Sequence, residues 1–180
     1  LGHAIYLTKE VVGSDEVCIV LGDTMCEYNI DEVIHSSDSM LGVKKVDDPR
    51  DFGVAEIDEN AVITRVVEKP QIPKSNMALV GIYKIKNTDA LFSCLEAHIG
   101  NDIQGGKEFS LSGALECMIN SGVVFRSFNV PNWFDCGKID TLLESNVTLM
   151  KKLGGKISPE HTFENVIIVP PVSIGSGCHI

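Results

Sequence analysis

The 180-residue sequence lacks a C-x-x-C cysteine pair, a basic amino-terminal segment and an excess of positive charge. Its six scattered cysteines favour reduced thiols in the cytoplasm over a disulfide framework or a zinc site. A net charge of −10 argues against nucleic-acid binding, because phosphate contacts need a basic face, although it leaves room for a small anionic ligand. No apolar run approaches the roughly 18 residues of a membrane helix, so no membrane contact is expected.

Both ends of the sequence read as interrupted elements. Residues 1–10, LGHAIYLTKE, lack the basic start and long apolar centre of a signal peptide and have the character of a helix body. At the other end, Ile168, Ile174 and Ile180 recur every six residues, as in a parallel β-helix. We therefore expect a fragment of a longer protein, with a core over residues 1–152 and a linker and first β-helix turns over 153–180.

Short apolar segments alternate with helical patterns, which predicts an α/β fold. Helices are expected at residues 1–10, 29–38, 88–98, 112–122 and 138–153. Strands are expected at residues 16–21, 40–46, 52–58, 61–68, 78–85 and 123–130. A tight turn at Glu59 and Asn60 predicts an antiparallel hairpin between the third and fourth strands, so the sheet is expected to be mixed.

Two acidic residues follow apolar segments at the expected rim of the sheet, where open α/β sheets bind ligands. Asp23 comes after a glycine at the end of CIVLGDT (18–24), and Asp135 lies in NWFDCG (132–137). Such a carboxylate either caps a helix or holds its own loop, or it binds a divalent cation. Magnesium is commonly held by one or two carboxylates together with substrate phosphates.

A charged pair stands before a proline in VVEKP (66–70). Pro70 favours an extended conformation at Lys69, because its ring crowds the preceding residue. Neighbouring side chains of an extended chain point to opposite faces, so Glu68 and Lys69 are able to address two groups, such as a hydroxyl and a phosphate. The alternative is a solvated charged pair at the end of a strand.

Four stretches in this order resemble the sugar-1-phosphate nucleotidylyltransferases: CIVLGDT, DPRDFGVAEID, VVEKPQIPKSNMALVGIY and WFDCGKIDTLLESN. This family includes glucose-1-phosphate thymidylyltransferases and uridylyltransferases, also called nucleotide-sugar pyrophosphorylases. The resemblance extends to about residue 152. It implies a mixed, mostly parallel Rossmann-like sheet flanked by helices, and a left-handed β-helix that starts within residues 153–180.

The resemblance also implies a sugar-binding pocket built by four residues. Gly53 matches a backbone contact to the sugar, and Glu68 matches the acid that binds the sugar hydroxyls. Lys69 matches the lysine that contacts the sugar phosphate. Val80, which precedes a glycine, is expected to line the same pocket.

The implied reaction is attack by a sugar 1-phosphate oxygen on the α-phosphorus of a nucleoside triphosphate, dTTP or UTP, with release of pyrophosphate. Asp23, Lys69 and Asp135 are the expected catalytic residues, and the two aspartates match the acids that hold Mg²⁺. Phosphoryl-type transfer depends mainly on positioning and charge neutralisation, which fits these side chains. A cytoplasmic homo-oligomer is expected.

The sequence departs from the family pattern at several positions. The 180 residues contain no G-x-G-x-R-x-x-P-x-T segment, the loop that holds the triphosphate in the family, so we expect this fragment alone to be inactive. Thr24 stands where asparagine is commoner, and Ser112 and Gly113 replace the last two residues of an E-x-x-L-T-D segment. The alternatives are a non-catalytic subunit that binds sugar nucleotide in a regulatory or scaffolding role, or part of a bifunctional acyltransferase.

Overall fold

Strand β6 (Met77–Ile85) is the central element of the computed structural model, which describes residues 1–101, 110–157 and 165–180. The chain forms two compact units, Leu1–Trp133 and Phe134–Ile180. Eight of the nine β6 residues are buried. A strand covered on both faces reads as a continuous apolar run, and this is why the sequence predicted β6 well.

The described part of the first unit contains seven complete strands and five helices. The strands are β1 (Val17–Val20), β2 (Thr24–Glu27), β3 (Ser39–Lys45), β4 (Gly53–Ile57), β5 (Ile63–Glu68), β6 and β7 (Phe125–Asn129). The helices are α1 (Gly2–Tyr6), α2 (Lys9–Val12), α3 (Ile30–Ile34), α4 (Thr88–Asn101) and α5 (Leu111–Asn120). The border between the units falls inside β8 (Asn132–Asp135), and α6 (Ile139–Leu153) belongs to the second unit.

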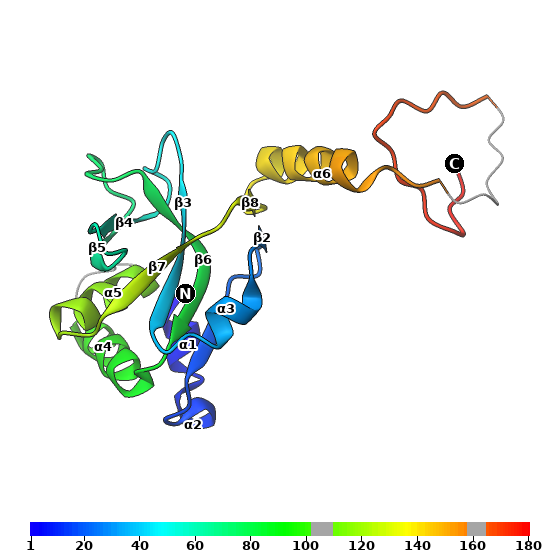
Figure 1. Cartoon of the computed structure of the whole chain (residues 1–180). Coiled ribbons are helices and arrows are strands. Elements are labelled where there is room, and N and C mark those ends of the chain that lie inside the picture. The colour runs from blue at the N-terminus through cyan, green and yellow to red at the C-terminus, as the bar shows by residue number, and fades with distance from the viewer. Residues whose placement is uncertain (102–109, 158–164) are drawn as a thin grey trace. The chain divides into compact units, whose positions relative to one another are not determined.

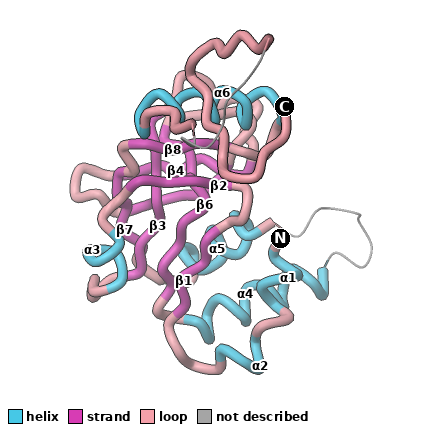
Figure 2. The backbone as a smooth tube through the Cα atoms, turned by 90° about the vertical axis from the view of Figure 1, so that its right-hand side faces the viewer, coloured by secondary structure: helices cyan, strands magenta, loops and turns pink. Residues whose placement is uncertain are grey.

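The main sheet has six strands in the order β5-β4-β6-β3-β7, with β1 also paired to β6 (Figure 1). Strands β2 and β8 form a separate two-stranded sheet. Helices α1, α4 and α5 lie on one side of the main sheet and α3 lies on the other (Figure 2). Strands and helices thus form the layered α/β arrangement that the sequence predicted.

The sheet is mixed, as expected, but the prediction that it is mostly parallel is wrong. Strand β6 runs antiparallel to β1, β3 and β4, and β4 runs antiparallel to β5. In the described part of the main sheet, β3 and β7 form the one parallel pair. Parallel neighbours need a connection of a dozen or more residues, and the link between the neighbouring strands β4 and β5 is shorter than that.

The main core lies between the sheet and helices α4 and α5. Its fully buried side chains include Leu41, Ile85, Leu91, Leu95, Leu115, Met118 and Phe125. A smaller cluster on the opposite face of β6 is formed by Val80, Ile82 and Val130. The alternation of side chains along a strand puts neighbouring β6 residues into these two different clusters.

Helices α4 and α5 are joined by a disulfide between Cys94 and Cys117, whose Cα atoms are 5.9 Å apart. The expectation that all six cysteines are reduced is therefore wrong for this pair. The two residues are 23 positions apart in the sequence, and the packing of the two helices brings them together. The free cysteines are Cys18, Cys26, Cys136 and Cys178.

Two local predictions differ from the structure. The helix expected at residues 1–10 is divided into α1 and α2, and Thr8 between them donates its hydroxyl to the Ile5 carbonyl at 2.7 Å. The hairpin turn is a longer loop than the expected Glu59-Asn60 pair, because Asp58 accepts from the backbone N–H groups of Asn60 and Val62.

The second unit contains α6 and an extended tail. An isolated parallel bridge joins Ile157 to Ile174, and the Ile174 N–H donates to the Lys156 carbonyl at 2.8 Å. The left-handed β-helix and the division of the chain at residue 152 remain predictions. Among the described residues, no helix combines the length and hydropathy of a membrane span.

Candidate functional site

Asp23 lies in the turn that connects β1 to β2, with its side chain exposed. It is close enough to Tyr83 on β6 to influence that phenol. Burial is the main cause of a raised Tyr83 pKa, and the charges of Glu68 and Asp23 raise the pKa further. The charges of two predicted site carboxylates, far apart in the sequence, therefore act on the same buried tyrosine.

Thr24, next to Asp23, connects three elements. Its hydroxyl donates to the Val80 carbonyl on β6 at 3.0 Å and accepts from the Trp133 indole N–H at 3.1 Å. The Trp133 ring packs edge-on against Phe52, with ring centroids 4.9 Å apart. Residues from all four motif stretches therefore meet around Thr24, and the turn that carries Asp23 is held by hydrogen bonds on both sides.

Gly53 and Glu68 are direct partners across the β4–β5 hairpin. A hydrogen bond from the Ser112 hydroxyl to Glu68 Oε2, 2.5 Å long, ties this end of the hairpin to α5. A Cβ atom on Gly53 would lie 3.0 Å from Ser112 Oγ, 3.1 Å from Leu79 Cδ1 and 3.3 Å from Glu68 Oε2. Glycine at this position thus leaves the space in which Ser112 and Glu68 meet.

Lys69 ends the hairpin in an unexpected conformation. Its φ of +42° is left-handed, so the prediction of an extended residue before Pro70 is wrong. The Lys69 N–H donates to the Phe52 carbonyl at 3.0 Å, which extends the hairpin contacts by one residue and turns the chain. A non-glycine residue in this region is strained, and such strain often occurs at functional sites. The Lys69 side chain is exposed next to Glu68.

The structure places Val80 away from Glu68. Its side chain is 1% exposed in the small cluster with Ile82 and Val130, on the opposite face of β6 from the main core. The preceding residue, Leu79, belongs to the main core and reaches the space beside Gly53. Leu79, rather than Val80, is therefore the β6 side chain next to the Gly53–Glu68 pair.

Asp135 ends β8 and belongs to the second unit, so it is described apart from Asp23. Its side chain is half-buried, and its Oδ1 accepts from the Gly137 N–H at 3.0 Å. This bond fits the loop-holding alternative and leaves the second carboxylate oxygen outside it. In the described part of the chain, no three or more His, Cys, Asp or Glu side chains form a metal-binding group. The proposed site of two carboxylates, Asp23 and Asp135, has fewer ligands than such a group.

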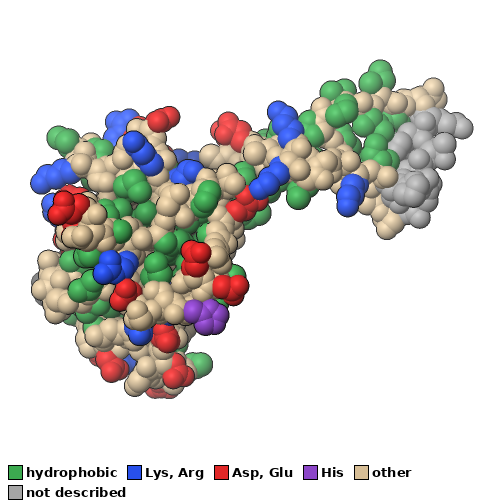
Figure 3. Space-filling model, in the orientation of Figure 1, with side chains coloured by type: hydrophobic (Ala, Val, Ile, Leu, Met, Phe, Trp, Pro, Cys, Tyr) green, Lys and Arg blue, Asp and Glu red, His purple; other side chains and the backbone are tan. Residues whose placement is uncertain are grey.

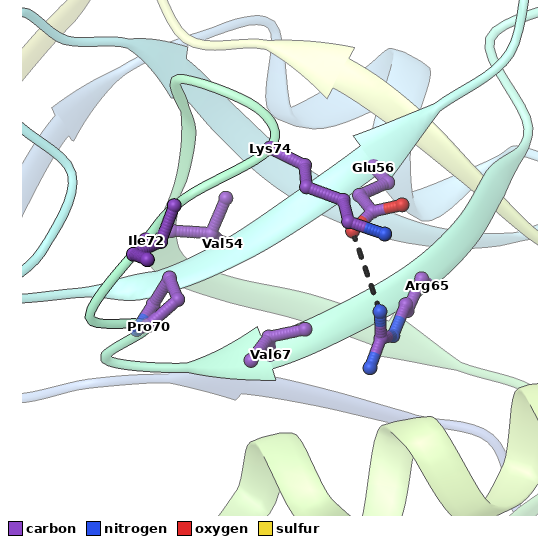
Figure 4. Close-up of a pocket in the computed structure, with 7 residues that line it drawn as sticks. All are labelled: Val54, Glu56, Arg65, Val67, Pro70, Ile72 and Lys74. Carbon is purple, nitrogen blue, oxygen red and sulfur yellow. Dashed lines mark ion pairs between the residues drawn. The ribbon is translucent and has the colours of Figure 1, made fainter.

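A cleft of about 150 Å³ lies between the β4–β5 hairpin and the segment that follows it (Figure 4). It is lined by Val54, Glu56, Arg65, Val67, Pro70, Ile72 and Lys74. Arg65 is already paired with Glu56 at 3.8 Å and with Glu116 at 3.5 Å. Because strand side chains alternate, Val67 and this cleft lie on the other face of the hairpin from Glu68.

Several residues at this site were missed from the sequence: Phe52, Leu79, Tyr83 and Trp133. All four lie inside the quoted motif stretches, so their position was a usable signal. Thr24 and Ser112 were noticed only as departures from the family pattern. The structure shows that each of these two hydroxyls makes a specific hydrogen bond to a neighbouring motif.

Comparison with protein families gives one match over most of the chain. A model described as nucleotidyl transferase matches residues 1–152. The Haloferax volcanii low-salt glycan biosynthesis nucleotidyltransferase Agl11 is 28% identical over 177 residues, which cover 93% of this chain and 48% of that protein. The Streptomyces antibioticus glucose-1-phosphate thymidylyltransferase is 29% identical over 190 residues, covering 100% of this chain and 51% of that protein. The chain thus spans about half the length of these relatives.

Solved structures show the same fold. A UDP-glucose pyrophosphorylase complexed with UDP-glucose matches with a TM-score of 0.68 and 23% identity. The match covers 84% of this chain and 62% of that one. At this identity the likeness supports the arrangement of the sheet and helices described above.

Proposed function

The chain belongs to the nucleotidyl transferase family, and we propose that it serves the transfer of a nucleotidyl group from dTTP or UTP to a sugar 1-phosphate. The relatives named as glucose-1-phosphate thymidylyltransferases support a sugar 1-phosphate as the acceptor. The observation that carries the proposal is the pairing of Gly53 with Glu68 beside Lys69 at one end of the hairpin.

This arrangement suits a sugar phosphate because it offers two different kinds of contact. The Glu68 carboxylate accepts hydrogen bonds from sugar hydroxyls, and the Lys69 ammonium group attracts the phosphate. Gly53 has no side chain and lets a sugar ring approach the backbone. Leu79 supplies an apolar surface beside them.

In the proposed reaction, an oxygen of the sugar phosphate attacks the α-phosphorus of the triphosphate. The bond between the α-phosphorus and the oxygen bridging to the β-phosphate breaks, and pyrophosphate leaves with that electron pair. Lys69 reduces the repulsion between two anionic reactants and holds the attacking phosphate. Positioning of this kind is a large part of catalysis in phosphoryl-type transfer.

The carboxylates Asp23 and Asp135 are proposed to hold magnesium. Carboxylate oxygens are the hard ligands that this ion prefers, and Asp23 is exposed at the end of the turn after β1. When bound, magnesium neutralises phosphate charge and polarises the phosphoryl group. The hydrogen bonds of Thr24 keep the Asp23 turn in place for this role.

The 180 residues contain more of the residues expected to bind the sugar phosphate than of those expected to bind the triphosphate. They contain no G-x-G-x-R-x-x-P-x-T segment that could cradle a triphosphate. We therefore propose that a protein of these 180 residues binds sugar 1-phosphate without turning it over. The alternative function is a non-catalytic subunit that binds sugar nucleotide. We also propose the β-helix, a homo-oligomer and a cytoplasmic location.

Calorimetry with glucose 1-phosphate tests the sugar side directly. Lys69→Ala is expected to weaken binding by about 1.5–3 kcal/mol, the usual contribution of a hydrogen bond to a charged group. The matched control is Lys74→Ala, because Lys74 lines the cleft on the other face of the hairpin. Binding that falls equally in both variants would remove Lys69 from the site.

Pyrophosphate release tests the reaction. It is measured with magnesium, glucose 1-phosphate and each nucleoside triphosphate, both for the 180 residues and for a version extended with the glycine-rich loop of a relative. Turnover is expected only in the extended protein, and Asp23→Asn or Asp135→Asn is expected to reduce it at least about a hundredfold through loss of metal charge. Binding of sugar nucleotide without turnover in the extended protein would favour the non-catalytic alternative.

A further inference from the structure

The carboxylate of Glu68 is held by a side chain from a different element. Ser112, in the first turn of α5, donates its hydroxyl to Glu68 Oε2 at 2.5 Å. The Ser112 residue is 7% exposed, whereas Glu68 at the end of β5 is exposed. The hydroxyl of the buried Ser112 thus donates to the carboxylate of the exposed Glu68 and fixes one of its two oxygens.

The surroundings make this contact specific. Gly53 lies directly across the hairpin from Glu68, and a Cβ atom there would come within 3.0 Å of Ser112 Oγ. Such a distance is too short for a side-chain contact unless Ser112 moves. Glycine at residue 53 therefore leaves room for this hydrogen bond, which also depends on the start of α5 being in its place against β5.

The start of α5 is itself fixed by a second serine. Ser110 is the N-cap residue, and its hydroxyl accepts from the Gly113 N–H at 3.1 Å. An N-cap bond contributes to the stability of the first helical turn. The two serines stand two positions apart but have different tasks, because only Ser112 contacts Glu68.

We propose that Ser112 is a positioning residue that orients Glu68 toward the hydroxyls of the sugar 1-phosphate, an inference that rests on the proposed function. With Oε2 held, Oε1 is the oxygen presented to the ligand. A free carboxylate at a strand end samples several rotamers, and fixing it in advance reduces the entropy lost on binding. The hydroxyl at residue 112 thereby contributes to sugar affinity without contacting the sugar.

In this proposal, different residues bind the two parts of the sugar 1-phosphate. Glu68 addresses hydroxyls, and Lys69 addresses the phosphate. Loss of the Ser112 hydroxyl is therefore expected to weaken glucose 1-phosphate and to leave the affinity for inorganic phosphate unchanged. A purely structural defect would weaken both ligands together.

The experiment titrates three single variants of the 180-residue chain with glucose 1-phosphate and with inorganic phosphate, followed by phosphorus NMR. Ser112→Ala is expected to raise the Kd for glucose 1-phosphate about tenfold and to leave the Kd for phosphate unchanged. Ser112→Thr keeps a hydroxyl at the same position and is expected to stay within about threefold of the parent chain. Ser110→Ala removes the helix cap and is expected to lower the melting temperature with little change in either Kd.

A double-variant cycle in the unliganded chain gives a readout that needs no ligand. If the bond exists in solution, Ser112→Ala and Glu68→Ala, each of which removes one partner, change the unfolding equilibrium constant non-additively. Additive effects would show that the bond is absent and would overturn the inference.

The binding outcomes separate this inference from the proposed function. A parent chain that binds glucose 1-phosphate, with an equal affinity in Ser112→Ala, overturns the positioning role and leaves the proposed function standing. A parent chain that shows the non-additivity but no affinity for glucose 1-phosphate overturns both, because the carboxylate is then oriented for something other than this sugar.

Discussion

The two units of the chain differ in how their apolar side chains are covered. In the first unit, Leu91, Leu115 and Phe125 are fully buried between the sheet and helices α4 and α5. In the described part of the second unit, Ser145 is the one buried residue, while residues such as Ile139 are 77% exposed. Packing therefore determines side-chain positions in the first unit far more than in the second.

The WFDCG motif of the candidate site contains residues from both units. In the WFDCG motif, Trp133 is held by Thr24 and Phe52 inside the first unit. Asp135, two residues later, has a described hydrogen bond only to the nearby Gly137 N–H. The sugar side of the proposed site is thus preorganised by the first unit, whereas the side chain of Asp135, a proposed magnesium ligand, is held by a bond within its own loop.

Charged side chains do not account for the difference between the two units. Lys and Arg side chains are interspersed with Asp and Glu over the visible face of the first unit (Figure 3). Several form exposed ion pairs, such as Arg126 with Asp38 at 2.9 Å. Exposed pairs contribute little to stability, so the contrast between the units comes from apolar burial.

The largest expected effect is the loss of stability when a side chain is removed from the core of the first unit. Leu115→Ala is expected to lower the free energy of unfolding by about 2–5 kcal/mol, because it removes a fully buried side chain and leaves a cavity. Leu142→Ala on α6, where the leucine is 46% exposed, is the matched control with an expected change of about 0.5 kcal/mol or less. Urea unfolding measures both. Equal losses would mean that α6 is covered as thoroughly as α5.

A buried lysine gives the next effect. Lys84 is 5% exposed, and its ammonium group donates to the carbonyls of Ile34 and Ser36 at 2.6 Å each and pairs with Glu16 at 3.1 Å. Lys84→Met leaves these carbonyls without a donor and is expected to cost about 1–3 kcal/mol in urea unfolding. Lys86→Met, at an exposed position, is the control. A small loss at Lys84 would show that water replaces the ammonium group.

Much of this fold was predictable because its strongest signals are local. The apolar run of β6 and the hairpin of β4 and β5 have the lengths and turn residues that strands require. Strand directions were harder to predict, because the family resemblance implied a mostly parallel sheet. The short connection between β4 and β5 indicated the correct antiparallel direction for that pair.

The candidate site was predictable to the extent that it lies in motifs. The family pattern singled out Gly53 and Glu68, which the structure pairs across the hairpin. The pattern did not identify Ser112 as a partner of Glu68, because that contact joins residues 44 positions apart. The left-handed backbone of Lys69 also depends on its tertiary contact with Phe52, against the local preference set by proline.

Thr24 offers a smaller test of the contacts that hold the site. Thr24→Val removes the hydroxyl that donates to the Val80 carbonyl and accepts from the Trp133 indole. The expected loss of unfolding free energy is about 1–2 kcal/mol, with a shift in the fluorescence of the single tryptophan. Thr64→Val is the control, because its hydroxyl makes an exposed bond to the Glu56 carbonyl. Unchanged fluorescence in Thr24→Val would argue against the Thr24–Trp133 contact.

The smallest expected effect is a pH dependence that arises at Cys26 in the first unit. Partial burial raises the pKa of its thiol from 9.0 to about 11. The folded chain therefore keeps this proton more tightly than the unfolded chain does. The resulting stability is fully present below pH 9 and is lost as the pH rises through about 11.

Comparison of the parent chain with Cys26→Ala isolates this contribution, since the other ionisable groups are common to both proteins. Between pH 9 and pH 11, the unfolding free energy of the parent is expected to fall more steeply than that of the variant. At neutral pH the Cys26 thiol stays protonated, and because the thiolate is the reactive form, its alkylation by iodoacetamide is expected to be slow. The exposed Cys178 of the second unit is the internal reference in mass spectrometry. Alkylation of Cys26 as fast as that of Cys178 would show that the β2 side of the site opens readily, and that the contrast between the two units is weaker at this edge than in the main core.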